Sequence, residues 1–278
     1  MADTPELRPL VLFHASCADG FCAAWVAHRR FGGGADYVAV NYGEPPPDVA
    51  GRHVYVLDFS YPRQVLLEMA RKAAGVSVLD HHASAREELA GLEPGRVANV
   101  SCVFDLAKSG GRLAWEYFFP RDEAPWLVRY TEDRDLWLWK LNDSRAVSAF
   151  IASWPFSFTL WDQWHGLRDD RDFWMDVLAG GRAIIRYQDK VVEEQCKHAH
   201  EVTMAGHKVL AVNATHLISE IAGKLAENRP FGVTFFVNAR GETVFSLRSR
   251  QGGIDVSEIA KSMGGGGHPQ AAGFTRAS

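Results

Sequence analysis

The sequence lacks the features that mark a secreted, membrane-spanning or duplex-binding protein. Its four cysteines form no CxxC pair, so we expect reduced thiols rather than a disulfide framework. No apolar run approaches the roughly 20 residues that a membrane-crossing helix needs, and the start, MADTPELRPL, lacks the basic and apolar regions of a signal peptide. The net charge of −4 gives no indication of the basic surface that binding long duplex nucleic acid requires. These absences predict a cytoplasmic protein without membrane or long-duplex partners.

What the sequence does contain is a globular composition in which strands and helices alternate. The apolar fraction is 47% and the charged fraction 23%. In the first half, strands are predicted over residues 9–14, 35–42, 53–60 and 75–82, with helices over 20–32 and 62–72. Strands that are apolar throughout and alternate with helices indicate a mainly parallel sheet with helices on both faces. Residues 84–150 are predicted to be mostly helical.

The second half predicts a smaller, mixed domain. A long helix over residues 173–202 is followed by predicted strands at 207–214, 232–239 and 242–250 and helices at 217–228 and 255–263. The turn ARGE pairs the last two strands in antiparallel fashion. The expected class is α/β, with a first domain over residues 1–155, a helical connector over 156–204 and a second domain over 205–278.

Acids and imidazoles gather where three of the first-half strands end. His14 closes the first strand, Asp58 falls at the end of the third and Asp80–His82 at the end of the fourth, while Asp19 lies on the loop after the first. In parallel sheets, ligands bind beyond the carboxyl ends of the strands. Clustered carboxylates repel one another unless a cation holds them together, so this pattern predicts a metal site.

The residue types indicate which cation is expected. Hard divalent cations prefer carboxylate oxygen, and imidazole widens the choice toward manganese, iron or zinc. A mixed Asp and His cluster without a cysteine pair suits Mn²⁺ best, with Mg²⁺ or another divalent ion as the alternative. Two such ions about 3.5–4 Å apart can activate a water for in-line displacement at phosphorus, provided that a carboxylate bridges them.

Five stretches, taken together and in order, resemble a known family. They are FHASCADGFCAAW at 13–25, VLDFS at 56–60, VLDHHAS at 78–84, YTEDRDLW at 130–137 and GGGGHPQAAGF at 264–274. The chain resembles the DHH phosphoesterase superfamily, in the branch with the DHH-associated C-terminal domain. The resemblance covers nearly the whole chain and implies an active site in the cleft between the two domains.

The resemblance also implies roles for single residues. The implied metal ligands are His14, Asp19, Asp58, His81 and Asp133. Asp58 matches the carboxylate that bridges two ions, and Asp135 is an alternative to Asp133 because DRD offers two acids. His82 matches the imidazole that faces the substrate phosphate. Asp80 would orient the histidine pair through hydrogen bonds.

The first motif departs from the family pattern. Family members usually carry two acids separated by one residue, whereas this stretch reads Cys17–Ala18–Asp19 with a single acid. Either Cys17 takes the vacant place, or fewer protein ligands hold the second ion. A cysteine is more often an inert apolar residue than a ligand. The sequence therefore predicts one metal site firmly and leaves a second open.

Residues for anion binding lie near the C-terminus. Arginine forks suit phosphate oxygens, and consecutive glycines let the backbone approach a ligand closely. The residues assigned to substrate binding are Arg248, Arg250, Gly265, Gly266, Gly267 and His268. Arg248 is also assigned a catalytic role, with His82 and Asp80, in neutralising charge on the phosphoryl oxygens.

These observations predict an enzyme, a metal-dependent phosphohydrolase acting on phosphodiester or phosphomonoester bonds. Short oligonucleotides or linear dinucleotides fit best, because the modest size and net charge of −4 do not favour a long strand. Two alternatives stay open: a small-nucleotide phosphatase or polyphosphatase, and a nucleotide-binding sensor weakened by the missing acid. The sequence leaves the oligomeric state open, with a homodimer as one option.

Overall fold

The computed structural model describes residues 7–15, 17–92 and 99–277 of the chain. The chain divides into two compact units, Met1–Arg182 and Ala183–Ser278. The division falls inside helix α8 (Arg171–Cys196), so the first part of the predicted connector belongs to the first unit. Within the described residues, no helix combines the length and apolarity that crossing a bilayer requires.

The first unit is built on a five-stranded sheet in which every pair is parallel. In the order β2-β1-β3-β4-β5, its strands are Asp36–Val40, Leu10–His14, His53–Leu57, Gly75–Asp80 and Val100–Phe104. The predicted parallel sheet is confirmed. The prediction missed β5, whose short stretch VSCVF lies in a region expected to be helical.

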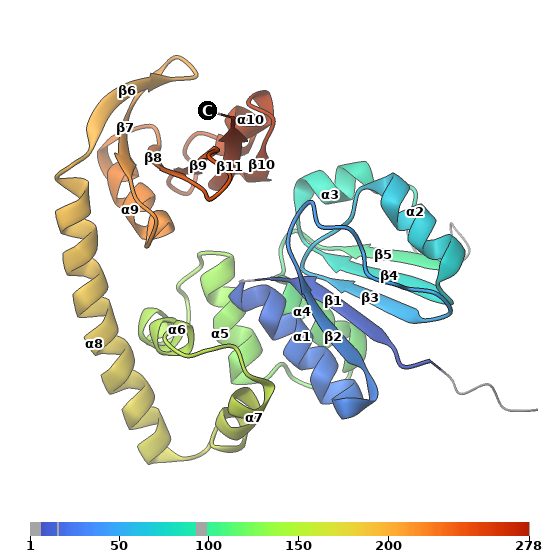
Figure 1. Ribbon diagram of the computed structural model, residues 1–278. Coiled ribbons are helices and arrows are strands. Elements are labelled where there is room, and N and C mark those ends of the chain that lie inside the picture. The colour runs from blue at the N-terminus through green and yellow to red at the C-terminus, as the bar shows by residue number, and fades with distance from the viewer. Residues whose placement is uncertain (1–6, 16, 93–98, 278) are drawn as a thin grey trace, which may run out of the picture. The chain divides into compact units, whose positions relative to one another are not determined.

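Helices cover both faces of this sheet, as predicted. Helices α1 (Ala18–Phe31) and α4 (Gly110–Phe118) lie on one face, and α2 (Arg63–Lys72) and α3 (Ala83–Glu88) on the other (Figure 1). Successive strand residues point to opposite faces, so Leu57 packs in the core under α1 and Val56 in the core under α2. Continuous apolar strands are therefore required, because neither face meets solvent.

The rest of the first unit is helical. Its helices are α5 (Trp126–Asp135), α6 (Ser144–Ala152), α7 (Phe158–Gly166) and the first part of α8. Trp126, Trp161 and Trp164 are buried with Trp25 in the core on the α1 face. Aromatic packing therefore fixes α5 and α7 against α1. The C-terminal end of α5 lies near the carboxyl ends of the parallel strands.

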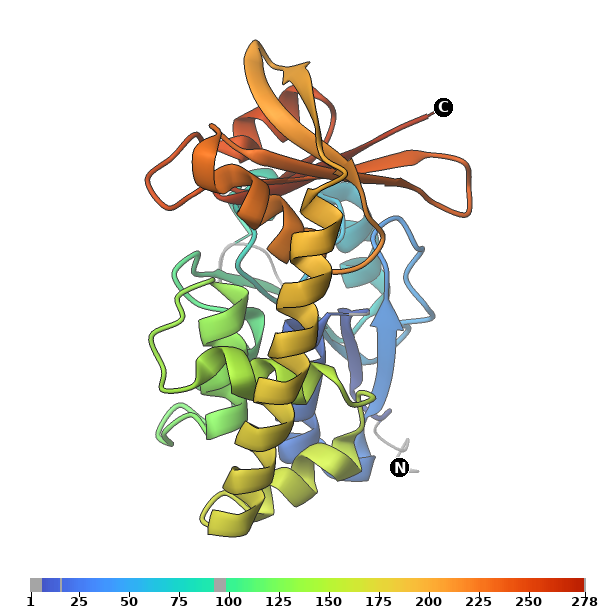
Figure 2. The same cartoon turned by 90° about the vertical axis from the view of Figure 1, so that its left-hand side faces the viewer.

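The second unit is a smaller, mixed α/β domain, as predicted. In the order β10-β11-β9-β8-β7-β6, its strands are Gly266–His268, Ala271–Arg276, Thr243–Arg248, Gly232–Val237, His207–Asn213 and His200–Met204. Only the β7–β8 pair is parallel within this sheet. Helices α9 (Ile218–Leu225) and α10 (Val256–Ser262) complete the unit, and the β6–β7 hairpin extends beyond the rest of the sheet (Figure 2).

The strand order of the parallel sheet determines where a ligand is expected. The chain leaves β1 toward β2 on one side and later returns through β3 on the other side, so β1 and β3 are adjacent strands whose connections diverge. Loops separate at such a switch point and leave a crevice beyond the carboxyl ends of the strands. His14 ends β1 and Asp58 directly follows β3, so both lie at this crevice.

Candidate metal centre

Three carboxylates converge on one imidazole at the switch point. The His81 Nε2 atom lies 3.2 Å from Asp58 Oδ1, 3.7 Å from Asp135 Oδ2 and 3.8 Å from Asp19 Oδ2. Asp19, Asp58 and His81 are each at most 2% exposed. Buried charges of one sign repel strongly in a low dielectric, so positive charge, from a protonated His81 or from a bound cation, would stabilise this arrangement.

Asp58 is the most constrained member of the cluster. Its backbone lies in the left-handed region, with φ of 63°, and its N–H donates to the carbonyl of Leu79 at 2.9 Å. Both of its carboxylate oxygens are buried, and within the described ranges neither makes a hydrogen bond of ordinary geometry. The imidazoles of His81 and His14 lie 3.2 and 3.6 Å from these oxygens and lower the pKa of Asp58 against the effect of burial. A buried carboxylate that stays charged is costly, and a bound divalent cation would stabilise it further.

The N-terminus of α4 fixes Asp19. The carboxylate of Asp19 accepts hydrogen bonds from the N–H groups of Gly110 at 2.5 Å and Gly111 at 2.9 Å. A Cβ at Gly110 would lie 2.6 Å from Asp58 Oδ1, and one at Gly111 would lie 2.6 Å from Cys22 Sγ. Glycine is therefore required at both positions, because only a bare backbone lets helix and cluster approach this closely.

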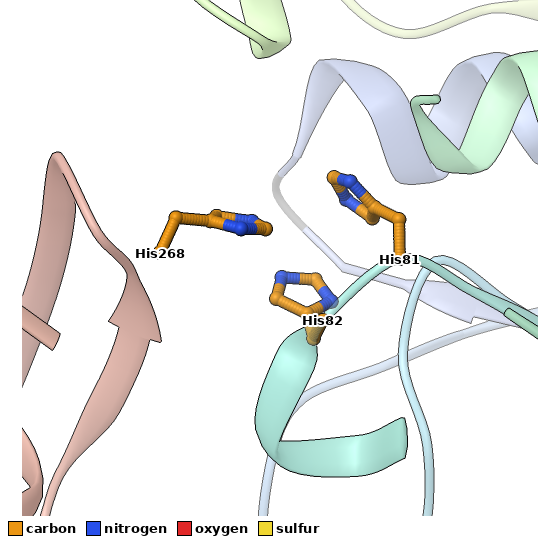
Figure 3. Close-up of side chains that lie close together, drawn as sticks. All are labelled: His81, His82 and His268. Carbon is orange, nitrogen blue, oxygen red and sulfur yellow. The ribbon is translucent and has the colours of Figure 1, made fainter. Parts of the chain in front are cut away.

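Asp80 organises the two histidines that follow it. Its Oδ1 accepts from the N–H groups of His81 at 2.7 Å and His82 at 3.2 Å, and lies 2.7 Å from His82 Nδ1. Ser60 donates to Oδ2 at 2.6 Å. The two imidazoles lie edge to face with centroids 4.6 Å apart, between the end of β4 and the start of α3 (Figure 3).

The protonation of the cluster follows from burial and mutual charge. Burial, followed by the charges of Asp58 and Asp135, raises the pKa of Asp19 well above its usual value. Burial also raises the pKa of Asp135, to about 6. For His81, burial acts in the opposite direction, but the surrounding carboxylates outweigh it and raise the pKa to about 10. Without a cation, a proton on His81 compensates part of the negative charge.

The pair formed by Asp80 and His82 is polarised in the same way. Burial would lower the pKa of His82, but its hydrogen bond to Asp80 raises it. Burial would raise the pKa of Asp80, but its hydrogen bonds from His82 and Ser60 lower it. The charged form of the pair is therefore favoured: a protonated His82 imidazole hydrogen-bonded to the Asp80 carboxylate. This places a positive charge beside the cluster.

Two overlapping sets of donor atoms can hold a metal ion. Asp19, Asp58 and His81 offer ligand atoms within 4.8 Å of one another, and so do His14, Cys17 and Asp58. Asp58 belongs to both sets, and His14 Nδ1 lies 3.6 Å from its Oδ2. Carboxylate oxygen with imidazole nitrogen fits Mn²⁺ or another divalent ion. The residues present therefore fit the predicted metal, with Cys17 in the place of the expected second acid.

Asp133, expected among the ligands, lies elsewhere. Its carboxylate accepts from the N–H groups of Lys140 at 2.9 Å and Leu141 at 3.3 Å, where it fixes the loop after α5. Asp135, two residues further along the helix, is the acid that reaches His81. Of the two alternatives that the sequence offered, the geometry favours Asp135.

The residues assigned to substrate binding lie in the second unit. Arg248 ends β9 and donates to Ser219 Oγ of α9 at 2.8 Å, which fixes its guanidinium. Arg250 follows in the next turn, and His268 ends β10 (Figure 3). Part of the glycine run has a packing role, since a Cβ at Gly265 would lie 2.1 Å from the carbonyl oxygen of Gly273.

The sequence pattern did not indicate three residues that build the centre. Gly110 and Gly111 hold Asp19, and Ser60 holds Asp80. The only signal for the glycines was SGG ahead of an apolar run, which predicts a capped helix start. Ser109 is indeed the N-cap, accepting from the N–H of Arg112.

Comparisons with known proteins agree with this architecture. Residues 207–277 match the DHHA1 domain. An uncharacterized protein of Acanthamoeba polyphaga mimivirus, R106, is 27% identical to the chain over 95% of its length, and the match spans 66% of that relative.

One solved structure shows the fold, and a second is reported with it. The DHH domain of a protein described as a member of the s1p family of ribosomal proteins has a TM-score of 0.61 at 13% identity, covering 97% of this chain and 82% of the other. A pGpG-specific phosphodiesterase, PggH, from Vibrio cholerae has a TM-score of 0.46 at 13% identity, covering 98% and 94%. The chain is thus similar in fold to a DHH domain, with Asp80–His82 at the end of β4, and its residues 207–277 match the DHHA1 domain.

Proposed function

We propose that this protein is a metal-dependent phosphohydrolase that cleaves phosphodiester bonds in short oligonucleotides or linear dinucleotides. One observation carries the proposal: three carboxylates from separate parts of the chain lie within 3.2–3.8 Å of a single imidazole nitrogen, and two of them, Asp19 and Asp58, are buried with that imidazole. The match of residues 207–277 to the DHHA1 domain and the similarity in fold to a DHH domain support the same conclusion. A divalent cation is the simplest way to offset this concentration of negative charge.

In this proposal Asp58 is shared between two metal positions. Asp19, His81 and Asp135 complete one position, and His14 and Cys17 complete the other, which we expect to bind more weakly. Mn²⁺ is the proposed ion, since imidazole and carboxylate donors suit it. Divalent ions, when bound, lower the pKa of water and offset charge on phosphoryl oxygens.

The chain's own groups perform the remaining steps. His82, held by Asp80 and carrying a raised pKa, places a protonated imidazole beside the cluster. That charge is suited to neutralise a non-bridging phosphoryl oxygen as negative charge develops there. Asp80 acts as a positioning residue, because its hydrogen bond fixes the orientation of the His82 ring.

Substrate binding is assigned to the DHHA1 domain as part of the same proposal. Arg248 is held by Ser219 in a fixed orientation, which suits a fork that binds phosphate oxygens. The other assigned residues are Arg250, Gly265, Gly266, Gly267 and His268. Backbone N–H groups of a glycine-rich turn and a guanidinium together favour a compact anion over a long duplex.

The proposal is tested with a substrate panel whose products are identified by mass. Linear dinucleotides, short oligonucleotides, nucleoside monophosphates and inorganic polyphosphate are incubated with and without Mn²⁺. We expect Mn²⁺-dependent release of mononucleotides, which Asp58→Ala abolishes and His216→Gln, at an exposed imidazole in the DHHA1 domain, leaves intact.

The other outcomes identify the alternatives. Release of inorganic phosphate from mononucleotides or polyphosphate, with dinucleotides untouched, would replace the phosphodiesterase by a phosphatase or polyphosphatase. Tight nucleotide binding without turnover of any substrate would make the protein a sensor.

A further inference from the structure

A pocket opens in the first unit directly beside the candidate metal centre. Its volume is about 680 Å³, within the usual range for small-molecule sites. The walls come from the segment after β2 (residues 41–49), from the segment that leads into α2 together with that helix (59–72), and from the start of α3 (82–88). Figure 1 shows α2 and α3 as neighbours on one face of the sheet.

Three side chains join the pocket to the centre. His82 and Ser60 line the pocket, and both bind the carboxylate of Asp80. The ring of Tyr42 lines it as well, packing edge-on against His14 at 4.9 Å and facing His82 at 6.5 Å. A group attached to a phosphate at the centre would therefore reach the pocket without crossing the protein interior.

The pocket wall suits a flat, partly apolar group. Tyr42 is 58% exposed and offers a ring face, and the residues around it are mostly apolar or aromatic. These are Pro45, Pro46, Pro47, Phe59, Val65 and Met69. Aromatic rings bind nucleobases by stacking with little dependence on sequence.

One polar group in the wall lacks a partner. The Tyr61 hydroxyl is buried and makes no hydrogen bond to any residue in the described part of the chain. A buried hydroxyl without a partner is unfavourable, so a ligand atom that accepts from it would gain affinity. Burial and the nearby charge of Glu44 raise the pKa of Tyr61 to about 12, so the hydroxyl keeps its proton.

The charge of the wall excludes a polyanion. Apart from His82, the residues of the wall that carry a charge at neutral pH are four acids and one lysine: Glu44, Asp48, Glu68, Glu88 and Lys72. Inorganic polyphosphate would meet repulsion and gain nothing from the apolar rings. A nucleobase is neutral, and its flat faces can stack on the aromatic rings of the wall. Its ring or exocyclic N–H groups can donate hydrogen bonds to the carboxylates.

We propose that this pocket binds a nucleobase next to the scissile phosphate, which makes nucleotides rather than inorganic polyphosphate the substrate class. The inference rests on the proposed phosphohydrolase function. It places phosphate chemistry at the metal centre and base recognition in a separate pocket of the same unit.

The test combines pocket variants with abasic substrates. Val65→Trp fills the pocket, Tyr61→Phe removes only the hydroxyl, and Arg71→Trp, exposed on the same helix and outside the wall, is the matched control. Kinetics are measured with Mn²⁺ on a linear dinucleotide and on its two abasic analogues, each of which lacks one base.

For the wild type, removing the base that occupies the pocket should raise KM by roughly tenfold or more. Val65→Trp should raise KM for the intact dinucleotide to a similar extent and abolish the difference between the substrates. Tyr61→Phe should raise KM about 2- to 10-fold with kcat unchanged. Arg71→Trp should match the wild type.

The inference is overturned by the following result: the wild type cleaves the dinucleotide, and Val65→Trp and Tyr61→Phe, both folded, have the same KM as the wild type. The two variants would also show the same change in KM as the wild type when a base is removed from the substrate. If Val65→Trp does not fold, Tyr61→Phe decides alone. If no substrate is cleaved, the proposed function fails separately. Calorimetric titration with a nucleoside monophosphate then tests the pocket: weaker binding by the pocket variants supports it, and equal or absent binding refutes it.

Discussion

Metal affinity at the centre should fall steeply as the pH is lowered, because protons and the cation compete for the same atoms. The carboxylates around His81 raise its pKa to about 10 against the effect of burial, and burial raises the pKa of Asp135 to about 6. A ligand atom must be free of its proton before it can bind a metal ion. A raised pKa in the metal-free protein therefore becomes a penalty on metal binding.

The size of this penalty follows from the number of protons displaced. Between about pH 6 and 8, His81 is protonated and its proton must leave, so this residue alone should raise affinity roughly tenfold per pH unit, and the raised pKa of Asp19 acts in the same direction. Over those two units the dissociation constant should fall at least about 100-fold. Below about pH 6 the proton on Asp135 adds a second competitor, and the dependence should steepen toward about 100-fold per unit.

Electron paramagnetic resonance of free Mn²⁺, titrated with metal-free protein across this range, measures the dissociation constant directly. Calorimetry in two buffers of different ionisation enthalpy counts the protons released. His81→Gln should bind Mn²⁺ more weakly and lose most of the dependence between pH 6 and 8, whereas His216→Gln should behave as the wild type. An affinity that changes less than about threefold between pH 6 and 8 would refute the assignment of His81 as a ligand that carries a proton.

Four further substitutions separate ligands from structural residues. Asp135→Asn should weaken Mn²⁺ binding at least about tenfold. Asp133→Asn should leave it unchanged and lower the free energy of unfolding by about 1–3 kcal/mol, because the amide keeps only one acceptor oxygen and one of the two N–H groups loses its partner; titration and thermal unfolding show both. Gly111→Ala should destabilise the fold by about 1–3 kcal/mol in denaturant unfolding, since its methyl group overlaps Cys22. Asp80→Asn should lower kcat about 10- to 100-fold with dinucleotide substrates, because the His82 ring loses its orientation.

Much of the centre was accessible from the sequence because its residues lie at strand ends. The pattern of apolar strands and helices predicts a parallel sheet, and in such a sheet the residues after each strand share one edge. His14, Asp58 and His81 could therefore be placed near one another before any coordinates were known. The confirmed sheet puts all three at that edge.

The rest depended on tertiary packing. Residues two apart on a helix point about 200° away from each other, so one acid of the DRD sequence faces the sheet edge and the other faces away. Which acid does so depends on how α5 is rotated, and buried Trp126 and Leu127 help to fix that rotation. Strand β5 was missed for a related reason, since five residues of mixed pattern carry too little periodicity to stand out between helices.

The features that sequence reasoning predicts least well are also those that point to function. Asp58 combines a left-handed backbone, a fully buried carboxylate that only weakly placed imidazoles approach among the described residues, and two acidic neighbours, each of which disfavours the folded state. Tight packing on both faces of the sheet can hold such a group in place, because the two cores stabilise the strands independently of it. Local conflicts of this kind persist where another interaction offsets them. A cation shared by Asp19, Asp58 and His81 would turn the repulsion among these groups into attraction, so the strain itself argues for the metal.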